Sequence, residues 1–232
     1  MNLLSGICNY FRGKNVKVVI AQTKVPHESV SMYNYQFWSC AEYLLSPDID
    51  AYIILSSVYT TLMPSSDFMT FVKKTEPRPV ISISLPLPVE NCYTVIADCS
   101  SPIKETVAHL KNCHNCKKIA FFSANKVDSD EGRARFIAYR EALEENGLEF
   151  DKKNVFDGTF TNFYAHDLIL EKFKSKSDLT FDSIICVNDM TAIGVLAAFN
   201  EIGVKVPEDV KITGFDDAFV ASMCEPTLTT IN

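Results

Sequence analysis

Short apolar runs alternate with amphipathic helical patterns along the first part of the chain. In residues 1–14 the apolar side chains recur with the 3.6-residue period of a helix. Two further helices are predicted, one over residues 68–75 and one that carries Phe37, Trp38, Ala41, Leu44 and Leu45. Runs rich in β-branched residues predict strands at 16–21, 51–55 and 80–83, and residues 94–97 begin a second set.

The same alternation is clearer in the second part of the chain. Its apolar runs predict four strands, at residues 119–123, 154–156, 183–187 and 211–215. Helices are predicted from Ser101 onward and over residues 130–146, 163–174 and 191–202. Near-continuous apolar strands separated by helices indicate parallel sheets that are covered on both faces. Two such sets predict an α/β protein of two lobes, with a junction near Asp98.

Charge and composition narrow the function classes. The 232 residues include 22 Lys and Arg against 29 Asp and Glu, a net charge of −7, and there is no basic run. The sequence therefore lacks an electrostatic footprint for nucleic acid or for an anionic membrane surface. No apolar stretch approaches the roughly 18 residues of a membrane span, and the N-terminus does not resemble a signal peptide. Eight cysteines spread through the chain indicate a reduced, cytoplasmic protein instead of a disulfide scaffold.

Several common catalytic and nucleotide-binding motifs are absent from the sequence. The eight glycines are too widely spaced for G-x-G-x-x-G, for the Walker phosphate loop or for the G-x-S-x-G nucleophile elbow. The four histidines do not form the H-E-x-x-H helix of zinc proteases. These absences exclude the common nucleotide-binding, hydrolase and zinc-protease classes. Because no residue is identified as a nucleophile, the sequence predicts a binding protein and not an enzyme.

Two weaker groups of polar residues leave alternatives open. Cys113 and Cys116 form a C-x-x-C, which fits a redox pair, half of a zinc site, or ordinary thiols in an exposed loop that is rich in lysine. Asp216 and Asp217 follow a predicted strand. They fit a pair of carboxylates for acid–base chemistry, or one that faces a pocket beside one that caps a helix.

Polar residues follow the other predicted strands of the second part as well. Asn188 and Asp189 come directly after one strand, where Asp189 also fits the N-cap of the next helix. In open α/β sheets, ligands bind beyond the carboxyl ends of the strands. Asn188, Asp216 and residues 158–160 all lie at such ends, and Arg135 lies in a helix that follows a strand. We therefore expect these groups to converge on one edge of the second lobe as a small-ligand site.

The same residues carry a family resemblance. Four segments contain N-D-x-x-A-x-G, V-P-x-D-V, G-F-D-D and P-x-L-T-T in this order: 185–194, 203–210, 212–217 and 225–231. They resemble the effector-binding core of the LacI/GalR family of regulators. Upstream segments that fit the same family are 109–110, 118–122, 135–139 and 142–143.

The resemblance implies a fold and a set of ligand contacts. The fold would be two Rossmann-like lobes joined by a hinge, of periplasmic-binding-protein type I, which close on a small polar ligand such as a sugar or a nucleobase. By position, Arg135 is similar to the family's ligand-binding arginine and Phe160 to its stacking aromatic. Asn188 and Asp216 are similar to its polar contacts. An aromatic ring covers the face of a sugar or base, and charge-assisted hydrogen bonds fix its edge.

The resemblance also sets expectations for the division of the chain. Three parts are expected: the N-terminal lobe without its first strand (1–97), the C-terminal lobe (98–226) and the start of a crossover back to the first lobe (227–232). Asp98 is expected at the hinge. Ser56 and Ser57, which follow a predicted strand, are the candidates for ligand contacts in the first lobe. Because the chain begins within a helix, we expect a fragment or a mis-started reading frame.

The output of such a domain stays open. The sequence contains no helix-turn-helix, so DNA would be contacted only through a domain outside this chain, in a homodimer as the family implies. Residues 81–88, Asp98 and residues 150–151 before the turn at 158–160 are similar to LacI-like sensor domains fused to diguanylate cyclase (GGDEF) or histidine kinase outputs. The alternatives are therefore a transcriptional regulator, a signalling sensor and a free solute-binding protein. The flanking reading frame would distinguish them.

Overall fold

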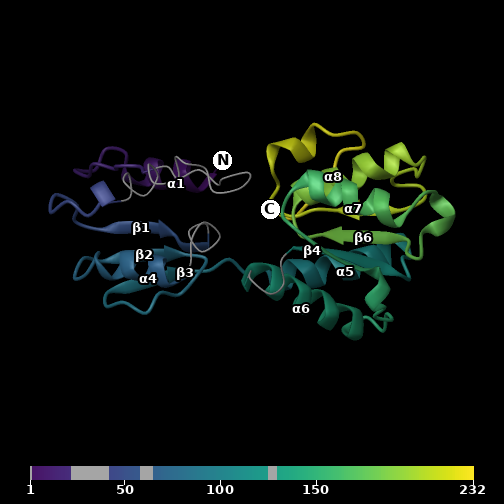
Figure 1. Cartoon of the computed structure of the whole chain (residues 1–232), viewed down its shortest axis with the longest axis horizontal. Helices are drawn as coiled ribbons and strands as arrows, with labels where there is room; N and C mark the ends of the chain where they lie inside the picture. Colours follow the sequence, from purple (N-terminus) through teal and green to yellow (C-terminus); the bar gives the residue numbers. More distant parts are fainter. Residues whose placement is uncertain (1, 22–41, 58–64, 125–129) are drawn as a thin grey trace. The chain divides into compact units, whose positions relative to one another are not determined.

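The computed structural model describes residues 2–21, 42–57, 65–124 and 130–232. The chain divides into two compact units, Met1–Ala97 (unit 1) and Asp98–Asn232 (unit 2). Each unit contains one sheet in which all paired strands are parallel, as predicted for the α/β class (Figure 1). Within the described ranges, every helix is too short or too polar to span a lipid bilayer.

Unit 1 is built on a three-stranded sheet with the order β1-β2-β3. Its strands are β1 (Tyr52–Leu55), β2 (Val80–Ile83) and β3 (Cys92–Val95), and its helices are α1 (Asn2–Phe11) and α4 (Ser65–Lys73). One face of the sheet packs on α4 through a buried cluster of Tyr52, Ile54, Phe68, Phe71, Val72 and Val80. This cluster is the core of unit 1.

Two strand predictions for unit 1 are wrong. Residues 16–21 form no strand: Val16, Val19 and Ile20 are half exposed, and no described strand pairs with them. A high β-propensity reflects packing against neighbouring strands, and this run lacks them. Residues 94–97 do not begin the second set, because β3 pairs with β2 and closes the first sheet, with Tyr93 opposite Ile81. The predicted helix around Phe37 lies largely outside the described residues.

Unit 2 carries a four-stranded sheet between two layers of helices, with the order β5-β4-β6-β7 (Figure 1). The strands are β4 (Ile119–Ala124), β5 (Val155–Gly158), β6 (Ser183–Cys186) and β7 (Lys211–Thr213). The α-helices are α5 (Ser100–His114), α6 (Asp130–Glu145), α7 (Asn162–Lys172) and α8 (Asp189–Glu201). Three short 3-10 helices are η1 (Lys152–Asn154), η2 (Lys176–Asp178) and η3 (Phe219–Ser222).

Successive residues of the central strands alternate between two buried clusters. Phe122 and Ile184 belong to the cluster formed with α7 and α8, whereas Phe121 and Ile185 belong to the one formed with α5 and α6. All residues of β4 and β6 are buried, as their near-continuous apolar sequences predict. Because the four strands are parallel, their carboxyl ends lie at the same edge of the sheet.

Several boundaries at this edge differ from prediction, and two of them concern the segments that carry Asn188 and Asp216. Helix α8 begins at Asp189, two residues earlier than predicted, and β7 ends at Thr213 instead of Phe215. Strand β7 ends early because the chain turns there: Asp216 and Asp217 adopt positive φ angles of 100° and 45°, which a strand does not accommodate. The residues after β7 therefore form a tight turn.

Candidate functional site

The fold places the four predicted contacts of unit 2 around the carboxyl edge of its sheet. Phe160 follows β5, Asn188 follows β6 and Asp216 follows β7. Arg135 lies on α6, which follows β4. The direct contacts among them are between Arg135 and Asp216, and between Asn188 and the backbone of Phe160.

The side chain of Arg135 is buried and held on several sides. Its Nη1 donates a hydrogen bond to the carbonyl oxygen of Val187. Its Nη2 lies 3.6 Å from Oδ1 of Asp216 and 3.8 Å from Oε1 of Glu131. The guanidinium also stacks on Phe215, with Cζ 3.7 Å from the ring centroid. Among the described residues, nothing accepts a hydrogen bond from the buried Nε, so the oriented cation retains one donor.

Asn188 joins two of the loops at this edge. Its Oδ1 accepts a hydrogen bond from the backbone N–H of Thr191 (2.8 Å), and its Nδ2 donates to the carbonyl oxygen of Phe160 (3.3 Å). Asn188, and not Asp189, is therefore the N-cap of α8. Its extended backbone, with φ of −153°, is the conformation of an N-cap, whereas Asp189 already lies in the first turn.

Asp216 carries a perturbed carboxyl group. Partial burial is the main cause that raises its pKa to about 6, although 48% of its side-chain surface remains exposed. The neighbouring cation of Arg135 opposes this shift, while the negative charges of Asp189 and Glu131 add to it. The carboxyl group thus changes its charge close to neutral pH.

The remaining predicted contacts are Phe160, Ser56 and Ser57, whose side chains make no contact with Arg135 or Asp216 among those described above. Phe160 is half-buried, and its carbonyl oxygen accepts the bond from Asn188. Ser56 and Ser57 lie in unit 1, outside the cluster of unit 2. Ser56 is fully buried, and its Oγ lies 2.6 Å from the Oγ of Ser82, a residue of the neighbouring strand β2.

The C-x-x-C pair is split between surface and core. Cys113 is exposed, whereas Cys116 is buried, and its burial raises the pKa of the thiol. The reading of both residues as exposed loop thiols is therefore wrong for Cys116, which packs beneath β4 with Leu110 and Ile119. Within the described part of the chain, no three His, Cys, Asp or Glu side chains are grouped to hold a metal ion.

Three residues of the site were not predicted. Glu131 lies four residues before Arg135, a spacing that places two side chains on the same helix face. Phe215 lies within the G-F-D-D segment, and its ring stacks on the guanidinium of Arg135. Asp189 is 1% exposed, and its carboxylate accepts hydrogen bonds from the backbone N–H of Ala218 (2.7 Å) and from Oγ1 of Thr230 (2.5 Å). No sequence signal marks Asp189 as buried.

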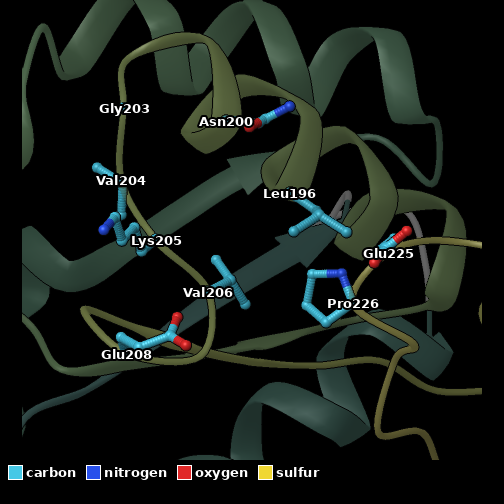
Figure 2. A pocket seen from close by; sticks show the side chains of 9 residues that line it. All are labelled: Leu196, Asn200, Gly203, Val204, Lys205, Val206, Glu208, Glu225 and Pro226. Carbon is cyan, nitrogen blue, oxygen red and sulfur yellow. The ribbon is translucent and has the colours of Figure 1, made fainter.

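A concave surface lies elsewhere on unit 2. Figure 2 shows this hollow of about 370 Å³, which is lined by Leu196, Asn200, Gly203, Val204, Lys205, Val206, Glu208, Glu225 and Pro226. It follows the C-terminal half of α8, whereas Asn188 and Asp189 lie at the start of that helix. None of the predicted contacts lines it.

Comparison with known proteins connects this geometry to a family. The family model described as "periplasmic binding protein-like domain" matches residues 107–232, more than half of the chain. The transcriptional regulator AscG of Escherichia coli is 28% identical over 193 residues, which cover 82% of this chain and 54% of AscG. The crystal structure of AscG matches with a TM-score of 0.65 and 26% identity, over 84% of this chain and 68% of that one.

A second solved structure shows the same fold. A LacI family transcriptional regulator from Lactobacillus casei with bound sucrose matches with a TM-score of 0.69 and 19% identity, over 98% of this chain and 78% of that one. Both relatives are described as transcriptional regulators, which agrees with the predicted binding role. The chain spans about half the length of the curated relative AscG. It belongs to the periplasmic binding protein-like domain family, as an effector-binding domain of the LacI/GalR type.

Proposed function

We propose that unit 2 binds a small, neutral, hydroxyl-rich ligand of the sugar class at the edge formed by Arg135, Asn188, Asp216 and Phe160. The observation that carries the proposal is the 3.6 Å pairing of Arg135 Nη2 with Asp216 Oδ1. A guanidinium donates hydrogen bonds and a carboxylate accepts them, so neighbouring hydroxyl groups of one sugar find both partners. The Lactobacillus casei regulator with bound sucrose supports the ligand class.

Local charge favours a neutral ligand over an anionic one. One cation, Arg135, lies within 4 Å of two carboxylates, those of Asp216 and Glu131. A phosphate or carboxylate ligand would meet this excess negative charge and be repelled. A neutral nucleobase is the second candidate, because the half-buried Phe160 and the amide of Asn188 suit a planar ring with polar edges.

Calorimetry with a panel of ligands tests this proposal. Glucose, sucrose, cellobiose and hypoxanthine would be titrated into the full chain, with glucose 6-phosphate as the charged counterpart of glucose. We expect one neutral compound to bind, and Arg135→Ala to weaken its binding about ten- to a hundredfold through loss of a charge-assisted contact. Phe160→Ala should weaken it to a similar degree.

The matched control is Arg140→Ala on the same helix. Arg140 is exposed and stacks on Phe150, with Cζ 5.1 Å from the ring centroid, so its loss should leave the affinity unchanged. If no neutral compound binds, or if Arg135→Ala binds as the wild type does, the proposed site is rejected.

The signal we propose is closure of the two units on the ligand. Asp98 would lie at the hinge, Ser56 and Ser57 would provide contacts from unit 1, and residues 227–232 would begin the crossover. Asp98 Oδ1 accepts hydrogen bonds from the N–H groups of Ser100 (2.8 Å) and Ser101 (3.2 Å), which anchors the start of α5 two residues after Asp98. A ligand that binds only one arrangement shifts the population toward it.

The output we propose is transcriptional regulation through a DNA-binding segment outside this chain, in a cytoplasmic homodimer. The regulator AscG supports this choice. The exposed Phe219 and Met223, on and just after η3, provide an apolar surface of the kind that dimers cover. The alternatives are a sensor with a GGDEF or histidine kinase output and a free solute-binding protein. Sequencing the flanking reading frame distinguishes the three, and sedimentation of Phe219→Lys tests the dimer.

A further inference from the structure

The buried carboxylate of Asp189 connects three segments around the candidate site. It lies at the first residue of α8 and is 1% exposed. Its Oδ2 accepts a hydrogen bond from Ala218 N–H (2.7 Å), its Oδ1 accepts one from Thr230 Oγ1 (2.5 Å), and its own N–H donates to the carbonyl oxygen of Phe215 (2.9 Å). A buried carboxylate is unfavourable unless such bonds compensate for its lost hydration.

The turn after β7 lies directly against this carboxylate. A Cβ at Gly214 would collide with Oδ1 of Asp189, so only glycine allows the approach. Two residues later, Asp216 adopts a φ of 100°, which a residue other than glycine occupies only when its surroundings hold it there. The turn formed by residues 214–218 therefore depends on contacts from outside itself.

The outgoing segment formed by residues 229–231 supplies the other contacts of this turn. Gly214 N–H donates to the carbonyl oxygen of Thr229, and Asp216 N–H donates to that of Ile231, both at 2.9 Å. Asp217 N–H donates to Oγ1 of Thr230 at 3.3 Å. Because Thr230 also donates to Asp189, one carboxylate holds both the turn and the outgoing segment.

We propose that Asp189 is a positioning residue, which fixes the turn 214–218 and the segment 229–231 to the start of α8 and thereby holds Asp216 opposite Arg135. The inference rests on the proposed function only in treating Asp216 as a ligand contact. The groups that face Asp216 are Arg135 and Glu131 from α6 and Asp189 from α8. Asp189 therefore acts on Asp216 in two ways, through the geometry of the turn and through its negative charge.

Two variants separate these effects. In Asp189→Asn the side chain keeps its shape but loses its charge and one of its two acceptor oxygens. Because the negative charge is removed, the Asp216 carboxyl should titrate at a lower pH than in the wild type. In Thr230→Val the charge stays and the hydroxyl contacts are lost. There the Asp216 amide should exchange with solvent about tenfold faster, while its titration midpoint stays unchanged. Ser222→Ala is the control, because this exposed hydroxyl donates a local hydrogen bond, to the carbonyl oxygen of Phe219.

NMR of the full, ligand-free chain provides both measurements: the pH titration of the Asp216 carboxyl carbon, identified with Asp216→Asn, and hydrogen exchange of its amide. Unchanged titration in Asp189→Asn together with unchanged exchange in Thr230→Val overturns the inference, even if the wild type binds a sugar. If both measurements shift as expected and no sugar binds, the positioning role stands and the proposed function fails. Faster exchange throughout β4 and β6 in Thr230→Val would indicate general loosening and would also overturn it.

Discussion

The guanidinium carbon of Arg135 lies 3.7 Å from the centroid of the Phe215 ring. Phe215 directly precedes Asp216, so one residue supports the flat face of the cation and the next places a carboxylate at its edge. The Phe215 ring in turn packs on the cluster between the sheet and helices α5 and α6. The chain after β7 thus fixes the position of Arg135 and balances its charge.

Replacing Phe215 should therefore weaken ligand binding although none of the proposed contact residues is changed. We expect Phe215→Leu to lower the affinity for the bound sugar about fivefold, because a cation–π contact contributes about 1 kcal/mol. Calorimetry with the sugar identified from the panel measures this change. Phe150→Leu is the control, since this ring supports Arg140 on the same helix, away from the proposed contacts. Equal affinities of the wild type and Phe215→Leu would show that the stacking does not orient the arginine.

Asn188 is predicted to have two separable roles. Asn188→Ala removes the cap of α8 and should lower the free energy of unfolding by about 1 kcal/mol. Asn188→Ser keeps a capping oxygen but loses the Nδ2 donor, so it should remain nearly as stable while binding sugar more weakly. Urea unfolding and calorimetry on both variants test this. If the serine variant binds as the wild type does, Asn188 is a cap and not a ligand contact.

His166 is expected to make stability depend on pH. Its Nδ1 lies 3.0 Å from Oδ1 of Asp167 and its Nε2 lies 2.8 Å from Oε1 of Glu201, which joins α7 to α8. The bond to Asp167 and then that to Glu201 raise the pKa of the imidazole above its ordinary value. A raised folded-state pKa stabilises the fold below the unfolded pKa of about 6.5, and this contribution disappears as the pH rises through the folded pKa.

The stability difference between wild type and His166→Gln should therefore be larger at about pH 5.5 than at about pH 8.5. Urea unfolding at the two pH values measures it. A double-mutant cycle with Glu201→Gln isolates the bond between the two helices. A difference that is the same at both pH values would contradict an ionised pair.

The sequence predicts the second sheet well because its signal is local and strong. The runs at β4 and β6 are apolar except for Ser123 and Ser183, and every position is buried. The order of polar residues after the strands also predicts the right edge for Arg135 and Asp216. By contrast, the apolar run 16–21 predicts a strand that does not form, since a strand depends on partners distant in the sequence.

The sequence does not predict which member of an adjacent pair of similar polar residues points into the site. In the pairs Asn188-Asp189 and Asp216-Asp217, both members have side chains that suit a cap or a pocket. Which one points inward is decided by a turn with positive φ and by the close approach of Gly214 to Asp189. Those features arise from the packing of residues 214–218 against α8, and the hydrophobic periodicity of the sequence does not predict them.

The titration of Asp216 should appear in ligand binding. Burial, the largest cause, raises the pKa of this carboxyl to about 6. Since the ionised form accepts stronger, charge-assisted hydrogen bonds at both oxygens, sugar affinity should rise as the pH increases from about 5 to about 7 and then level off. Calorimetry across this range measures the profile. Asp216→Asn should remove the pH dependence, and Asp217→Asn, on the exposed neighbour, should retain it.

The same shift in pKa should act on stability in the opposite direction. The folded-state pKa of Asp216 lies above its unfolded value of about 3.9, so the fold disfavours the ionised form. Its contribution to stability is therefore present at low pH and decreases as the pH rises from about 4 to about 6. Relative to Asp216→Asn, the ligand-free wild type should lose stability over a pH range in which its sugar affinity begins to increase. If stability and affinity rise together with pH, the carboxyl group is stabilised by Arg135 more than it is destabilised by burial, and its assigned pKa is wrong.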